Sequence, residues 1–128
     1  MKYLLDTHTL LWWFHEPALL SGRVTDEIGN SEHDIFVSAV SAMEIATKHR
    51  KGRLEYQTTL AGQFEAEIAV EGFIPLSITS AHAERAGSYQ AAHKDPWDRL
   101  LAAQTEFEDL SIMSIDAFFP SIGIPVFW

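Results

Sequence analysis

Four acidic side chains stand where carboxylates could hold a metal ion and perform hydrolysis. Asp6 and Asp116 each directly follow a short strand-like segment, and Glu44 and Asp98 each lie in the first turn of a segment with helical spacing. Mg²⁺ and Mn²⁺ prefer oxygen donors of this kind. Two unit charges about 4 Å apart repel by roughly 4 kcal/mol at an effective dielectric constant near 20, so four converging carboxylates would need protons or cations. The candidate chemistry is metal-assisted hydrolysis.

The elements that must position these acids alternate along the chain. Apolar spacing predicts strands over residues 3–5, 35–38, 73–78, 112–115 and 124–128, and helices over 7–16, 21–30, 41–51, 60–71, 80–92 and 95–109. We expect Ser21 and Asp95 to cap helices, Gly52 to end one in a left-handed conformation, and Pro75 to mark an edge strand.

Strands separated by helices predict an α/β fold, with a central parallel sheet of four to five strands and helices on both faces. Crossovers in such sheets are nearly always right-handed, so the carboxyl ends of the strands lie along one edge. Ligands bind beyond that edge. The pattern therefore delivers the four acids, from four separate segments, to one rim.

Composition indicates one structured domain over residues 1–128. The chain is 47% hydrophobic, without repeats or low-complexity segments. It contains no cysteine, which removes thiolate chemistry, and neither a signal peptide nor a membrane span is expected, so we expect a cytoplasmic protein without a membrane partner. The net charge of -9 opposes non-specific binding to polyanions. Nucleic-acid binding would need bound cations or the basic run over residues 48–53, which could equally be a solvated helix end.

Three of the acids also have purely structural explanations. Ser41 and Glu44 match a capping box, in which the Glu44 carboxylate would only accept a backbone N–H. Asp98 is a favourable acid in a first helical turn, and Asp116 could be an ordinary turn former. Asp6 is harder to explain in this way, because a carboxylate directly after an apolar strand gains little unless something positive binds it.

Several motifs together resemble a known family. These are Asp6-Thr7-His8, Ser41 to Ile45 with Lys48 and Gly52 behind it, the segment His93 to Gln104, and Ser114-Ile115-Asp116 before Phe119. In this order and at these intervals they resemble the successive blocks of VapC-type PIN-domain toxins, from one end of the chain to the other. The resemblance implies a PIN-like fold and a ribonuclease that hydrolyses RNA phosphodiester bonds.

The resemblance also implies roles for individual residues. Asp6, Glu44, Asp98 and Asp116 would form the acidic quartet that holds one or two Mg²⁺ or Mn²⁺ ions, and those ions would activate a water for in-line attack. Supporting roles fall to three further residues: Thr7 and Ser114 as hydroxyls, and Arg99 either to steer phosphate or to pair with a neighbouring acid. Asp95 is ambiguous, and we favour its capping role. Toxins of this group further imply a homodimer and a cognate antitoxin that inserts a segment into the site.

Two other functions remain open at the level of sequence. An aspartyl-phosphate phosphatase or a receiver-like phospho-acceptor would also place Asp6 at a strand end beside Mg²⁺. His8 occupies the position at which the phosphatases usually have a second acid. A non-catalytic module whose acidic rim binds a basic partner is the other alternative.

Overall fold

The sheet at the centre of the molecule contains five parallel strands in the order β3-β2-β1-β4-β5. They are β1 (Lys2–Leu5), β2 (Asp34–Ser38), β3 (Ile74–Leu76), β4 (Ser111–Met113) and β5 (Val126–Phe127). The computed structural model describes residues 1–92 and 95–128, so the predictions that involve His93 and Lys94 lie outside the described residues. The predicted α/β fold with its parallel sheet is confirmed.

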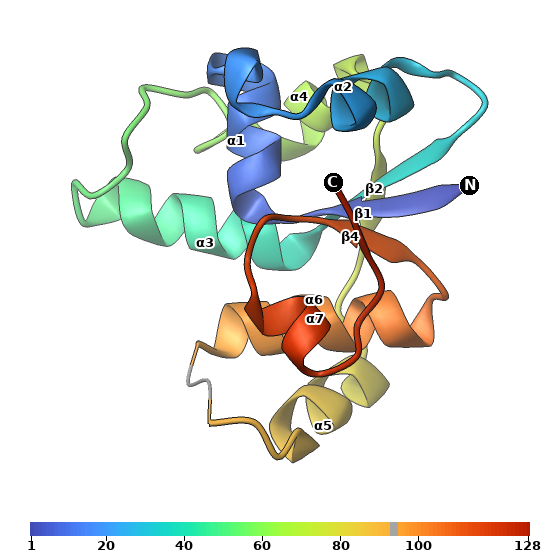
Figure 1. Ribbon diagram of the computed structural model, residues 1–128. Coiled ribbons are helices and arrows are strands. Elements are labelled where there is room, and N and C mark those ends of the chain that lie inside the picture. Colours follow the sequence, from blue (N-terminus) through green and yellow to red (C-terminus); the bar gives the residue numbers. More distant parts are fainter. Residues whose placement is uncertain (93–94) are drawn as a thin grey trace.

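Helices cover both faces of this sheet. Along the described chain they are α1 (Thr7–His15), a 3₁₀ turn over Pro17–Leu19, α2 (Gly22–Gly29), α3 (Ala39–Arg50), α4 (Phe64–Val70), α5 (Ser80–Ser88), α6 (Pro96–Phe107) and α7 (Phe118–Ser121). Figure 1 shows α1, α2 and α4 on one side and α5, α6 and α7 on the other. Helix α3 follows β2 directly and contacts both α1 and α6, so it joins the two layers.

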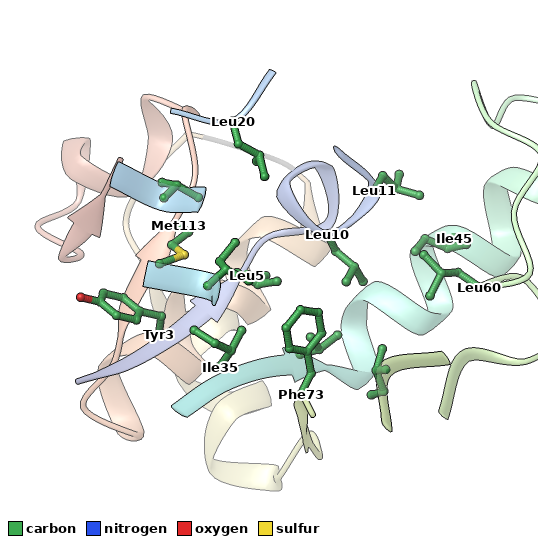
Figure 2. Packing of buried hydrophobic residues seen from close by; sticks show 14 residues of the cluster. Tyr3, Leu5, Leu10, Leu11, Leu20, Ile35, Ile45, Leu60, Phe73 and Met113 are labelled. Atoms are coloured by element: carbon green, nitrogen blue, oxygen red, sulfur yellow. The ribbon is translucent and has the colours of Figure 1, made fainter. Parts of the chain in front are cut away.

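A separate hydrophobic cluster fills each side of the sheet. Successive side chains of a strand point to opposite faces, and in β1 Tyr3 and Leu5 belong to one cluster while Leu4 belongs to the other. Figure 2 shows the first cluster, in which Leu5 lies near Leu10 of α1. The second cluster includes Leu101 of α6. The central strand β1 is thus anchored from both faces, which fixes where its carboxyl end lies.

Local signals in the sequence predicted several boundaries correctly. Ser21 and Asp95 are N-caps whose side chains accept backbone N–H groups of α2 and α6. Gly52 has a φ of +66° just after α3, a conformation that glycine adopts without steric cost. Pro75 lies in β3, which is an edge strand as expected. None of the described helices is long and apolar enough to cross a bilayer.

Other boundaries were wrong. Helix α3 begins at Ala39 rather than Ser41, because the Ser38 hydroxyl accepts the Val40 N–H and acts as the N-cap. Ser41 therefore lies inside the helix and forms no capping box with Glu44. Helix α4 begins at Phe64 instead of residue 60, since Gly62 adopts a φ of +111° that a right-handed helix cannot contain. Strands β1, β2 and β4 begin one residue earlier than predicted, whereas β3, β5, α1, α2, α5 and α6 are shorter than predicted.

Candidate functional site

Asp6 lies at the carboxyl end of β1, in the middle of the sheet. Its Oδ1 accepts a hydrogen bond from the Thr9 N–H at 2.8 Å, so Asp6 is also the N-cap of α1. The Thr9 hydroxyl donates to the Met113 carbonyl at 2.8 Å, and the Asp6 N–H donates to the same carbonyl at 3.3 Å. These bonds hold the start of α1 against the end of β4. Only 7% of Asp6 is exposed, so its carboxylate has a fixed place at the sheet edge.

Burial has a clear electrostatic effect on this carboxylate. Desolvation raises the pKa of Asp6 above its ordinary value, because a low-dielectric surrounding disfavours the charged form. Hydrogen bonds from Ser114 and Thr9 and the nearby charge of His8 act in the opposite direction and lower the pKa, but by less. The charged form of this carboxyl is therefore destabilised, and an added positive charge nearby would offset that cost.

A buried hydrogen bond joins the elements that carry Asp6 and Glu44. The hydroxyl oxygens of Thr7, at the start of α1, and Ser41, in the first turn of α3, are 2.9 Å apart. Both residues are buried. Glu44 follows Ser41 by three residues, almost one helical turn, and is itself only 7% exposed. Thr7 thus bonds to Ser41, a contact partner that the sequence did not reveal.

Glu44 has a cationic partner on its own helix. The Lys48 Nζ lies 2.8 Å from Glu44 Oε2, and the Lys48 side chain is 33% exposed. This pair was not predicted, although an acid and a lysine four residues apart on a helix are a signal that indicates it. With the capping box absent, this ion pair is the structural role of Glu44 that remains.

Ser114 connects Asp6 to Asp116. The buried Ser114 hydroxyl hydrogen-bonds to the Asp6 carboxylate and accepts the Asp116 N–H at 3.0 Å. The Asp116 side chain is exposed, and its Oδ1 accepts the Phe118 N–H at 2.9 Å. Asp116 is therefore a turn former, the structural alternative left open by the sequence. Its backbone N–H also bonds to Ser114, the residue that bonds to Asp6.

The remaining acid, Asp98, lies on helix α6. Asp98 is half-buried in its first turn, and α6 packs against α3. Asp95 has the capping role that we favoured, since its Oδ1 accepts the Trp97 N–H at 2.9 Å. Arg99 donates to the carbonyls of Ala86 at 2.9 Å, Tyr89 at 2.5 Å and Ala91 at 3.1 Å. Its guanidinium thereby ties the end of α5 and the following loop to α6.

The donor set matches a hard divalent ion in chemistry. Asp6, Glu44, Asp98 and Asp116 offer only carboxylate oxygens, and the raised pKa of Asp6 marks a position where a cation would stabilise the charged form. Across residues 1–92 and 95–128, however, no three His, Asp or Glu side chains are arranged to hold a metal ion together. Lys48 is ion-paired with Glu44, and the Asp116 carboxylate caps its own turn. The candidate ligands therefore have the right chemistry but are not preassembled around one metal position.

Comparison with protein families gives one match that spans nearly the whole chain. The model of the PIN domain matches residues 3–124. No curated protein sequence is significantly similar to the chain.

Solved structures show the same fold at low sequence identity. VapBC2 from Rickettsia felis, bound to a promoter DNA fragment, superposes with a TM-score of 0.70 at 13% identity, covering 98% of this chain and 96% of the other. FitAcB from Neisseria gonorrhoeae gives a TM-score of 0.69 at 21% identity over 98% and 96% of the two chains. A toxin–antitoxin complex from Klebsiella pneumoniae gives 0.56 at 18% identity over 89% and 86%.

Proposed function

Since this chain belongs to the PIN-domain family, we propose that it is a VapC-type toxin that hydrolyses RNA phosphodiester bonds with Mg²⁺ or Mn²⁺. The observation that carries the proposal is the pair of nearly buried carboxylates Asp6 and Glu44, whose elements are joined by the bond between Thr7 and Ser41. A buried carboxylate at the carboxyl edge of a parallel sheet costs stability unless a positive charge pairs with it, and ligands bind at this edge.

The chain's own residues would divide the work as follows. Asp6 and Asp98 are our first choices as direct ligands, and Glu44 and Asp116 either bind the ion or position its waters. A divalent ion held by these residues would supply positive charge, which would lower the pKa of the attacking water and stabilise the leaving oxygen. One carboxylate of the quartet accepts the proton of that water as general base. Ser114 and Thr9 keep the Asp6 carboxylate in place throughout.

Family membership favours hydrolysis of RNA over phosphoryl transfer to Asp6. The match to the PIN domain extends over residues 3–124 and so includes all four acids. A non-catalytic acidic module has to be separated by experiment, because the same rim could bind a basic partner.

Cleavage of RNA by the Asp6→Asn variant is the decisive measurement. Purified protein is incubated with a panel of RNAs with Mg²⁺, with Mn²⁺ or with EDTA. We expect wild-type cleavage that requires the metal, and a loss of about a hundred-fold or more in the variant, comparable to removing one strong charge-stabilising group.

The matched control is Asp26→Asn, which makes the same change on the exposed surface of α2 and should cleave like the wild type. Cleavage that survives both EDTA and the Asp6 substitution would rule out the mechanism. An absence of cleavage in every arm would favour the non-catalytic module.

The proposal also includes partners. One structure with this fold is a toxin–antitoxin complex from Klebsiella pneumoniae. We propose that this chain likewise is held by a cognate antitoxin, forms a homodimer and acts in the cytoplasm. Side chains that would gain from such coverage exist on the surface: Met43 and Ile115 are 61% and 62% exposed. Large exposed apolar side chains often mark interfaces when they form a patch.

A further inference from the structure

Three basic side chains from different segments meet around a small cavity beside the acids. The cavity has a volume of about 50 Å³. His8 of α1, Lys48 of α3 and Arg53 from the segment after α3 all line it. The convergence is a product of the fold, because these residues are separated by 40 and 5 positions in the sequence.

Two of these residues are already linked to the candidate ligands. His8 is close enough to Asp6 for its charge to lower the pKa of that carboxylate. Lys48 is ion-paired with Glu44 at 2.8 Å. The cavity therefore adjoins the two buried acids, and an anion bound in it would lie next to the candidate ligands.

Arg53 differs from Lys48 in having an uncommitted charge. Its backbone N–H donates to the Lys48 carbonyl at 2.9 Å, which folds the chain back over the end of α3 directly after Gly52. Its side chain is exposed, and none of the ion pairs found among the described residues involves it. A guanidinium in this state can form a bidentate contact with a phosphate.

The walls of the cavity favour binding of an anion. Leu11 and Leu54 contribute buried and half-buried apolar surface, which strengthens electrostatic attraction by excluding water. Tyr56 anchors the wall, since its hydroxyl donates to Glu16 Oε1 at 2.6 Å and its ring stacks on His15 with centroids 5.2 Å apart. The lining contains one acid, Glu55, against three basic residues.

We propose that His8, Lys48 and Arg53 form a subsite for one phosphate group of an RNA strand, next to the carboxylates that act on the neighbouring bond. This inference rests on the proposed ribonuclease function. It explains how a chain of net charge -9 attracts RNA: the attraction is local and adjoins the site, and the basic run as a whole is not required. Arg53, which lies farthest along the run, is the principal phosphate contact.

RNA binding without cleavage tests the subsite directly. Binding of a fluorescein-labelled single-stranded RNA is followed by fluorescence anisotropy in EDTA, with intactness of the RNA checked on a gel. We expect Arg53→Gln to raise the Kd by about tenfold or more, as for loss of a charged hydrogen bond, and Arg53→Lys to recover part of the affinity. The slope of log Kd against log salt should fall by about 0.7, the value for one contact to a single strand.

Arg50→Gln and Lys51→Gln are the matched controls. Both residues belong to the same basic run and are exposed, and neither lines the cavity. We expect each to change the Kd by less than about twofold, a far smaller change than loss of a charged hydrogen bond produces. Equal weakening by Arg53→Gln and Arg50→Gln would show a general attraction and overturn the subsite, and so would unchanged binding in Arg53→Gln.

A second measurement separates this inference from the proposed function. In cleavage assays with Mn²⁺, loss of a substrate-binding contact should raise the KM more than it lowers the kcat. If the wild type cleaves RNA and Arg53→Gln behaves like Arg50→Gln, the subsite fails alone. If Arg53→Gln weakens RNA binding and the wild type never cleaves, the ribonuclease function fails and the subsite stands. No RNA binding by the wild type at about 10⁻⁴ M, the weak limit of non-specific affinity, would also overturn the subsite.

Discussion

Asp6 combines two opposite contributions to stability in one side chain. As the N-cap of α1 it accepts the Thr9 N–H, an interaction worth about 1 kcal/mol. As a nearly buried anion it loses hydration, which raises its pKa. Because asparagine caps helices about as well as aspartate, Asp6→Asn removes the cost of the charge and retains the cap. The residue is therefore suited to a charged function more than to stability.

The pH dependence of unfolding should reveal this cost. With a folded-state pKa raised above the ordinary value of 3.8, the native protein holds the Asp6 proton to a higher pH than the unfolded chain does. Protonated Asp6 therefore contributes fully to the free energy of unfolding below pH 3.8, the ordinary pKa, and this contribution is lost as the pH rises through the raised folded-state pKa. We expect Asp6→Asn to melt above the wild type at pH 7 in EDTA, by roughly 4 °C per kcal/mol recovered, and the gap to close toward pH 4.

Calorimetry between pH 4 and pH 8 checks this expectation, with Asp26→Asn as the control that should follow the wild type at each pH. Parallel melting curves for wild type and Asp6→Asn across this range would contradict a raised pKa at Asp6.

At the scale of elements, the site depends on how the start of α6 is held. Arg99 bonds to three carbonyls at and beyond the end of α5, and α5 and α6 pack extensively against each other. The loop between them leads directly into Asp95 and Asp98. The expectation that Arg99 steers phosphate or pairs with a neighbouring acid stays a prediction. Its bonds to these three carbonyls hold the segment that carries Asp98.

Replacing Arg99 should destabilise the fold more than replacing an exposed arginine nearby. Arg99→Met leaves three carbonyls without their charged donor, and we expect a loss of about 2 kcal/mol or more in the free energy of unfolding. Arg85→Met removes a surface pair with Glu106, at 2.8 Å between half-exposed side chains, and should cost less than Arg99→Met because exposed ion pairs contribute little. Urea unfolding of both variants measures the difference, and equal losses would show that the carbonyl contacts add nothing.

At the scale of the whole molecule, the sheet is shared by both hydrophobic clusters. Leu4 and Leu5 are adjacent in β1 and are fully buried in opposite clusters. Both clusters include residues of β1, which pairs with β2 and β4. Disrupting β1 would therefore expose both clusters at once. The predicted single domain should therefore unfold as one cooperative unit.

Substitutions in either cluster test that cooperativity. Leu10→Ala on one side and Leu101→Ala on the other remove side chains that are 0% and 1% exposed, and each should cost about 2–5 kcal/mol. Val70→Ala, at a residue that is 84% exposed, should change stability by less than about 0.5 kcal/mol. We expect a single calorimetric transition that both core variants shift downward. Two transitions that respond separately to Leu10→Ala and Leu101→Ala would show that the chain holds two independent units.

Local chemistry alone determined the order of the elements and the positions of the acids along them. A carboxylate after an apolar strand, proline after Asp95 and glycine after α3 act through backbone geometry and hydrogen bonds within a few residues. The tertiary structure decided which partners these residues meet. Ser41 bonds to Thr7 across 34 positions, Arg99 serves the end of another helix, and His8 and Arg53 line one cavity. Such contacts follow from how sheet and helices pack, because the free energy of packing depends on distant surfaces that no local pattern encodes.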